Sequence, residues 1–147
     1  MTNDPQLATH PPFTHVTSAH ISISDLEATV LTDEVGAAVT FIGRVRNHDH
    51  GRRVITLEYE AHPSAGEVLA RIAHSISEQF EGVHIAAVHR TGSLAIGETA
   101  LGVVVASAHR GEALAACSAL VEEIKASVPI WKLQTFEDGT TEWVNCL

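Results

Sequence analysis

The stretch Glu122-Glu-Ile-Lys-Ala-Ser-Val-Pro-Ile-Trp-Lys-Leu-Gln134 decides where the last helix of the chain gives way to extended structure. Pro129 cannot continue a helix, so a helix should end before it and a strand should follow it. The stretch also holds Lys125 and Lys132, the only lysines in the chain. Because small soluble domains usually scatter lysines over their surface, these two are candidates for a functional role. Spacing alone leaves an alternative, in which Lys125 complements the helix dipole and Lys132 is solvated.

Apolar patterns on both sides of this stretch extend the prediction. Residues 99–108 are nearly all apolar, which indicates a buried central strand. Residues 130–136 and 141–145 flank Asp138-Gly139, a turn pair typical of a β-hairpin. The helix between the buried strand and Pro129 should direct five residues inward: Leu114, Cys117, Leu120, Val121 and Ile124.

The first 90 residues contain the remaining elements. Two helices should each open at a capping box, a serine followed three residues later by a glutamate. Periodicity predicts, in chain order, a short helix over 24–31, strands at 35–46 and 53–61, a helix over 64–82 and a strand at 83–90. Residues 1–20 are rich in Pro, Thr and His and should form a flexible arm.

These elements predict an α+β fold. Helices and strands alternate, but the chain ends in a hairpin and several connections are too short for crossovers. We therefore expect a largely antiparallel sheet with two main helices packed on one face and a C-terminal β-hairpin. A chain of 147 residues is long enough for one domain with its own core, which we place at residues 21–147.

Composition excludes several classes of function. A formal net charge of −9 argues against a general nucleic-acid or anionic-membrane surface, so a bound anion would need a local cluster of bases. Cys117 and the penultimate Cys146 show no metal-type spacing and suggest no disulfide framework. The N-terminal residues do not resemble a signal peptide, and no apolar run approaches the ~20 residues of a membrane span. We expect a cytoplasmic protein.

Five of the nine basic residues fall in or at the ends of predicted core elements: Arg44, Arg46, Arg110, Lys125 and Lys132. Arg44 and Arg46 share one face of a strand. Arg110 follows His109 at a strand–helix junction, where free backbone N–H groups favour a phosphate. The alternatives are surface salt bridges for the arginine pair and an Arg110 that only caps surface carbonyls.

If these five residues converge, they form a positive pocket for a small phosphorylated or carboxylated ligand. Like charges and partial desolvation there would favour a neutral lysine amine, which could act as a base or a nucleophile. Ten histidines raise the question of a metal, but only His48 and His50 lie close together, with no evident third ligand. No nucleophile elbow, P-loop or dinucleotide motif occurs, so we expect no metal and no resident cofactor.

Five segments carry a resemblance to a known family. They are Val39-Thr-Phe-Ile-Gly-Arg-Val-Arg-Asn-His48, Leu57-Glu-Tyr59, His89-Arg-Thr-Gly-Ser-Leu-Ala-Ile-Gly-Glu98, Ser107-Ala-His-Arg110, and Lys125 with the following Pro129-Ile-Trp-Lys132. In this order and spacing, over about residues 35–144, they resemble the large, catalytic subunit of molybdopterin synthase, the MoaE family.

The resemblance implies a sulfurtransferase of molybdenum cofactor biosynthesis with an α/β hammerhead-like fold. Such enzymes convert cyclic pyranopterin monophosphate to molybdopterin by installing two dithiolene sulfurs. The sulfur arrives as a thiocarboxylate on the C-terminal Gly-Gly tail of a small ubiquitin-like subunit. The implied assembly is a homodimer of large subunits within a heterotetramer, with no nucleic acid and no membrane involved.

The resemblance also implies residue roles. Lys125 would be the leading catalytic residue, and Lys132 would hold substrate or stabilise developing negative charge. The implied substrate contacts are Arg44, Val45, Arg46, His109, Arg110, Lys125, Lys132, Leu133 and Gln134. The chain departs from the family at Gln134, where relatives often have an acidic residue, and in its short C-terminus.

Two other functions stay open at this point. A non-catalytic module that binds a small anion or a nucleotide could use the same basic pocket without any ubiquitin-like partner. Metal-assisted hydrolysis through His48 and His50 would require bound metal.

Overall fold

The computed structural model describes residues 10–145, and its central feature is a four-stranded sheet. The strands are β1 (Phe13–Thr17), β5 (His84–Arg90), β7 (Thr99–Ser107) and β2 (Ala37–Arg44), in this spatial order. The β1–β5 pair is parallel, whereas the β5–β7 and β2–β7 pairs are antiparallel. The predicted buried strand is confirmed as β7, whose residues after Thr99 are all buried.

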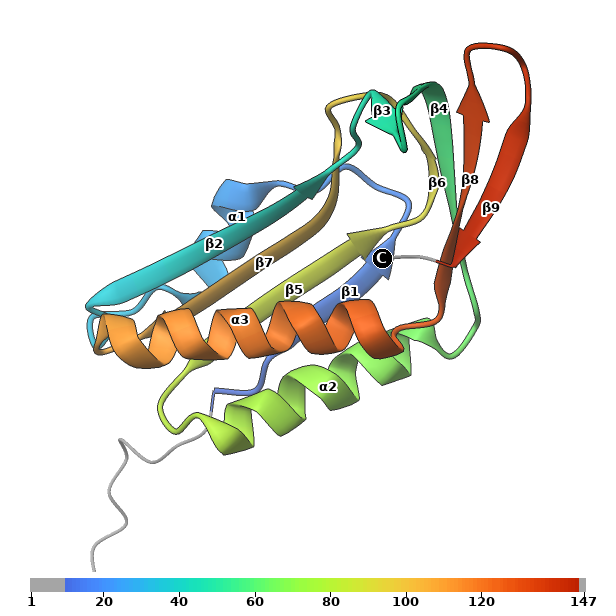
Figure 1. Ribbon diagram of the computed structural model, residues 1–147. Helices are drawn as coiled ribbons and strands as arrows, with labels where there is room; N and C mark the ends of the chain where they lie inside the picture. The colour runs from blue at the N-terminus through green and yellow to red at the C-terminus, as the bar shows by residue number, and fades with distance from the viewer. Residues whose placement is uncertain (1–9, 146–147) are drawn as a thin grey trace, which may run out of the picture.

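A second sheet continues the fold beyond the ends of these strands (Figure 1). It consists of β3 (His48–Asp49), β4 (Arg52–Ala61), β8 (Ile130–Phe136) and β9 (Thr141–Asn145), with β6 (Gly92–Leu94) also paired to β4. The β8–β9 pair is the predicted C-terminal hairpin. The expected α+β class is confirmed, but the strands form two sheets where we expected one.

Three helices cover the first sheet (Figure 1). Helices α2 (Ala65–Gln79) and α3 (Arg110–Ser127) lie side by side on one face, as predicted for the two main helices. The short α1 (Ile23–Val30) packs on the opposite face.

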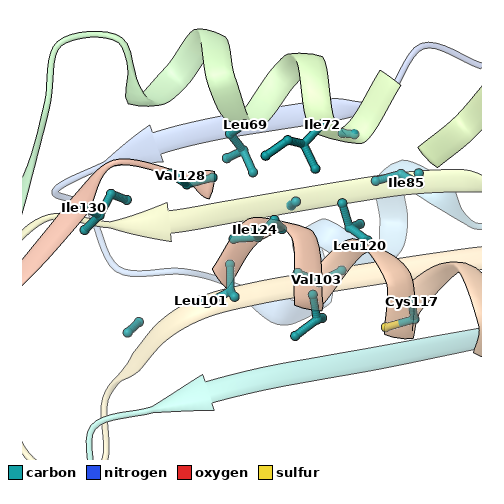
Figure 2. Packing of buried hydrophobic residues seen from close by; sticks show 14 of the residues in the cluster. Leu69, Ile72, Ile85, Leu101, Val103, Cys117, Leu120, Ile124, Val128 and Ile130 are labelled. Atoms are coloured by element: carbon teal, nitrogen blue, oxygen red, sulfur yellow. The ribbon is translucent and has the colours of Figure 1, made fainter. Parts of the chain in front are cut away.

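Strand alternation divides the core into two clusters. The larger cluster joins α2 and α3 to the facing side of β5 and β7, through residues that include Leu69, Ile85, Val103, Leu120 and Ile124 (Figure 2). The intervening residues of the same strands, Ala86, Val88, Val104 and Ala106, pack under α1. Burial on both faces explains why β5 and β7 are continuous apolar runs in the sequence.

The end of α3 connects the two sheets. The Val128 N–H donates to the Ile124 carbonyl at the C-terminus of the helix, and Pro129 follows. The chain then enters β8, which pairs with β4. Lys125 therefore lies in the last helical turn, while Lys132 lies on a strand of the second sheet.

Several expectations were wrong in detail. Phe13–Thr17 belongs to the sheet as β1 and is not part of a flexible arm. Leu114, expected to face inward, is 55% exposed. The capping boxes do not form as predicted, because Ser22 caps α1 and the Ser64 hydroxyl lies 2.8 Å from His62 Nδ1 instead of capping α2.

No helix within residues 10–145 is both long and apolar enough to cross a bilayer.

Candidate active site

A cavity of ≈ 440 Å³ lies where the two sheets meet the end of α3. Its lining residues come from β2 and the loop after it, β4, β5, β7, α3 and β8. They are Phe41, Gly43, Arg44, Arg46, Tyr59, His89, Ala100, Leu101, Lys125 and Lys132. The structure thus brings together four of the five basic residues that the sequence singled out.

Backbone geometry brings Arg44 and Arg46 to this cavity. The pairing of β2 with β7 shifts register between Gly43 and Arg44, and such irregularities redirect side chains. Arg44 Nε donates a hydrogen bond to the Gly97 carbonyl at 3.0 Å. Arg46 Nη2 lies 3.6 Å from Asp49 Oδ1, so Asp49 partly balances its charge.

The other three cations of the cavity make no direct ion pair among the described residues. Lys125, Lys132 and Arg44 form no ion pair with any acidic side chain in the part of the chain that the structure describes. The two lysines approach from different elements, Lys125 from the last turn of α3 and Lys132 from β8. A cavity with several uncompensated cations attracts an anionic ligand, even in a protein whose net charge is −9.

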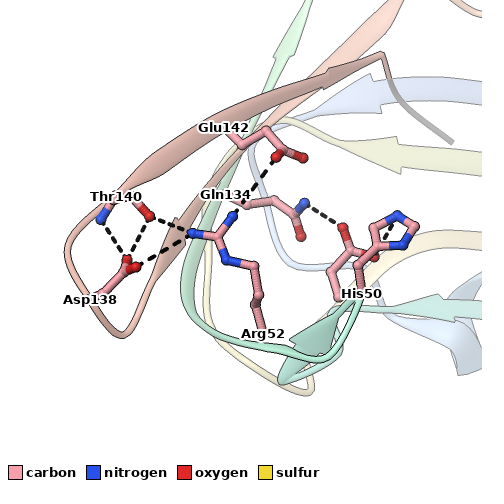
Figure 3. A network of polar contacts seen from close by, with 7 residues as sticks. His50, Arg52, Gln134, Asp138, Thr140 and Glu142 are labelled. Atoms are coloured by element: carbon pink, nitrogen blue, oxygen red, sulfur yellow. Dashed lines mark hydrogen bonds and ion pairs between the residues drawn. The ribbon is translucent and has the colours of Figure 1, made fainter.

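A buried amide supports the arginine side of the cavity. Gln134 is 2% exposed, and its Nε2 donates to Asp49 Oδ2 at 2.8 Å (Figure 3). This hydrogen bond is the main reason why the pKa of Asp49 lies below its usual value, and the charges of His50, Lys132 and Arg46 lower it further. Gln134 therefore stabilises the ionised form of the carboxylate that faces Arg46 but does not itself line the cavity.

His89 and Tyr59 were not predicted as cavity residues. The His89 ring is fully buried, meets the Tyr59 ring edge-on at 5.1 Å between centroids, and donates from Nδ1 to the Arg90 carbonyl at 2.7 Å. Burial, with a smaller effect from the Lys125 charge, lowers the pKa of His89 to about 4. The imidazole is therefore neutral at pH 7. Two sequence features could have indicated them: His89 lies within an apolar strand, and Tyr59 alternates with the same residues as the buried Leu57.

The remaining predicted contacts lie outside the cavity of a single chain. Val45 is buried beside it, and Leu133 does not line it. His109 and Arg110 stand at the start of α3, whereas Lys125 stands near its end. Fifteen helical residues span about 22 Å, so Arg110 cannot share one small ligand with Lys125 of the same chain.

The described residues that line this cavity include one histidine and no Cys, Asp or Glu. Within residues 10–145, no three His, Cys, Asp or Glu side chains come close enough to hold a metal ion. Cys117 is buried in the core, and burial raises the pKa of its thiol, so it is not an activated nucleophile. Cys146 lies outside the described residues.

A second hollow, of ≈ 540 Å³, runs between α2 and α3. Its charged lining residues are Arg71 and Glu123, so the formal charge of its lining is zero. The cavity at the end of α3 is therefore the better candidate for binding an anion.

The chain is similar to known proteins over most of its length. The family model described as MoaE protein matches residues 16–127. The molybdopterin synthase catalytic subunit of Bacillus subtilis is 42% identical over 130 residues, which cover 88% of this chain and 82% of that protein. The molybdopterin synthase catalytic subunit 1 of Mycobacterium tuberculosis is 37% identical and covers 90% of each chain.

Solved structures are similar in fold as well. Molybdopterin synthase from Staphylococcus aureus superposes with a TM-score of 0.83 at 35% identity, covering 88% of this chain and 94% of that one. A complex of subunits 1 and 2 of the molybdopterin-converting factor from Helicobacter pylori has a matching chain with a TM-score of 0.67 at 18% identity, covering 92% and 90%. At that identity the second likeness concerns the fold alone.

Proposed function

The chain belongs to the MoaE protein family and is an enzyme of molybdenum cofactor biosynthesis, and we propose that its cationic cavity is where cyclic pyranopterin monophosphate receives sulfur. The observation that carries the proposal is the convergence of Arg44, Arg46, Lys125 and Lys132 on one cavity. The substrate has an anionic phosphate, which such a cavity attracts.

The proposed reaction brings two anions together. The phosphate of the substrate and the thiocarboxylate of the sulfur donor repel each other, by about 4 kcal/mol for unit charges ~4 Å apart at an effective dielectric constant of about 20. The ammonium groups of Lys125 and Lys132, which form no ion pair within residues 10–145, offset this repulsion. We assign Lys125 the leading catalytic role and Lys132 the stabilisation of negative charge that develops during transfer.

The proposed sulfur donor is a small ubiquitin-like subunit whose C-terminal Gly-Gly tail ends in a thiocarboxylate. A flexible tail without bulky side chains suits a cavity of ≈ 440 Å³ that the substrate must also enter. An imported sulfur also removes the need for a reactive cysteine, in keeping with the buried Cys117. We propose a cytoplasmic heterotetramer with two copies of this chain at its centre.

We assign His109 and Arg110 to the cavity of the second copy. They stand about 22 Å along α3 from Lys125 and so can contact the same substrate only across a dimer. There Arg110 and the backbone N–H groups at the start of α3 would bind the phosphate.

Replacement of Lys125 tests the proposal. We expect Lys125→Ala to fold normally and to lose sulfur transfer from a thiocarboxylated small subunit to cyclic pyranopterin monophosphate, because the cavity loses its leading catalytic group. The measurement is molybdopterin formation in vitro, with circular dichroism to check the fold. Arg71→Ala, which changes an exposed base of α2 outside the cavity, is the matched control and should retain activity.

Wild-type rates for Lys125→Ala would remove that residue from the mechanism. If the wild-type protein binds the pterin but forms no product with any thiocarboxylated partner, the chain is a non-catalytic anion-binding module.

A further inference from the structure

The His89–Glu98 stretch carries part of the family resemblance, yet only His89 lines the cavity. The end of this stretch makes three hydrogen bonds with Arg44 and Val45. The Gly97 carbonyl accepts a hydrogen bond from Arg44 Nε at 3.0 Å. The Gly97 N–H donates to the Val45 carbonyl at 2.8 Å, and the Val45 N–H donates to the Glu98 carbonyl at 3.0 Å.

Two features of position 97 favour glycine. Its φ of 88° lies in the left-handed region, which disfavours other residues. A Cβ atom there would also lie 3.0 Å from Arg44 Nη2. A larger residue at 97 would therefore displace the guanidinium group that enters the cavity.

An ion pair with a buried arginine holds Glu98 in place. Arg90 Nη1 contacts Glu98 Oε2, and Arg90 Nη2 donates to the Ser18 carbonyl at 3.2 Å. The Arg90 side chain is only 6% exposed. The hydrogen bond from Arg90 is the largest cause of the lowered pKa of Glu98, so this carboxylate is ionised and paired.

We propose that Gly97, together with the Arg90–Glu98 ion pair, forms a positioning device that directs the Arg44 guanidinium toward the anionic group of the substrate. The two backbone hydrogen bonds hold Val45, just after the register shift between Gly43 and Arg44, and the Gly97 carbonyl holds the Arg44 side chain. A pre-oriented arginine loses less conformational freedom when the substrate binds. This inference rests on the proposed function, because it requires Arg44 to contact the substrate.

A double-mutant cycle tests the inference on the assembled enzyme. The variants are Gly97→Ala, Arg44→Ala and the pair, assayed for KM and kcat with cyclic pyranopterin monophosphate and a thiocarboxylated small subunit. We expect Gly97→Ala to raise KM roughly tenfold, as for a weakened charge-assisted hydrogen bond, with kcat within about twofold. In the Arg44→Ala background, Gly97→Ala should raise KM no further.

Gly139→Ala is the matched control. Gly139 has a φ of 84°, and a Cβ there meets nothing within 4 Å, so the change imposes the same backbone strain away from Arg44. Its KM should equal that of the wild type. Glu98→Gln is the second variant in case Gly97→Ala does not fold, and its KM should also rise only when Arg44 is present.

Additive effects of Gly97→Ala and Arg44→Ala, or a folded Gly97→Ala with the wild-type KM, would overturn the inference and leave the proposed function intact. An Arg44→Ala variant with the wild-type KM would overturn the inference and the proposed substrate role of Arg44 together.

Discussion

His89 lines the cavity and also makes the stability of the fold depend on pH. Its imidazole is held neutral in the cavity wall, since burial lowers its pKa to about 4 from the 6.5 of an exposed histidine. Below pH 6.5 the unfolded chain binds a proton at this position, while the folded chain does so only near pH 4. The folded state therefore has its full stability above pH 6.5 and loses about 3 kcal/mol as the pH falls to 4.

We expect His89→Gln to remove this part of the pH dependence, because glutamine does not titrate. The measurement is the free energy of unfolding in urea at several pH values between 7 and 4.5, for wild type and variant. The other histidines titrate in both proteins, so the difference between the two curves isolates position 89. Parallel curves would show that His89 is not buried and neutral.

Gln134 shows how a departure from the family pattern fits its surroundings. Its amide donates to Asp49, which faces Arg46. An acidic residue at 134 would bring a second carboxylate against Asp49 and raise the pKa of one of the two. Glutamine at 134 thus helps to hold Asp49 beside Arg46. The sequence alone could not show this contact, because Asp49 and Gln134 are 85 positions apart.

At the level of elements, the buried face of α3 differs from the face that the apolar pattern predicted. Leu120 is fully buried between the sheet and α2, whereas Leu114 is 55% exposed. The first two buried residues of the helix are small, Ala113 and Ala116. Alanine is weakly apolar and occurs on every face of a helix. Near the start of α3 the apolar pattern therefore pointed to Leu114 as the inward residue, whereas Ala113 is buried.

Leu120→Ala and Leu114→Ala make a matched test of this assignment. We expect Leu120→Ala to destabilise the fold by about 2–5 kcal/mol, because it opens a cavity in the larger core cluster. Leu114→Ala should change stability by less than about 0.5 kcal/mol. Chemical denaturation measures both values, and equal losses would contradict the observed orientation of α3.

The strength of the local pattern decided which elements could be predicted. Long segments such as α2, α3, β4 and β7 have clear periodicity or continuous apolar sequence, and they occur close to the expected bounds. Edge strand β1 has a polar composition and only one neighbour, so nothing in its sequence distinguishes it from an arm. Three-residue β6 is recognisable only by its pairing with β4.

For the whole molecule, the rarity of lysine was the most useful guide to the site. Lys125 and Lys132 stood out because the chain has no others, and the structure brings both to one cavity with Arg44 and Arg46. Phe41, Ala100 and Leu101 could not be assigned to the cavity, because residues of these types usually belong to a core. The length of α3 separates Arg110 from Lys125 of the same chain. We expect Arg110 of a second chain to reach the cavity instead.

Mixed dimers test that expectation. If Lys125 of one copy and Arg110 of the other share a cavity, a dimer of a Lys125→Ala chain and an Arg110→Ala chain has one intact cavity and one doubly altered cavity. Co-expressed variants should then recover about a quarter of wild-type molybdopterin formation, since random pairing makes about half of the dimers mixed. Each variant alone should be less active. No recovery in the mixture would mean that Lys125 and Arg110 of the same chain serve one cavity, or that Arg110 serves no cavity.

A crystal structure of the chain with cyclic pyranopterin monophosphate bound tests most directly whether the cationic cavity is the substrate site. We expect electron density for the pterin in the cavity at the end of α3, within hydrogen-bond distance of Lys125, Lys132 and at least one of Arg44 and Arg46. Density for the pterin elsewhere on the protein, with this cavity empty, would contradict it.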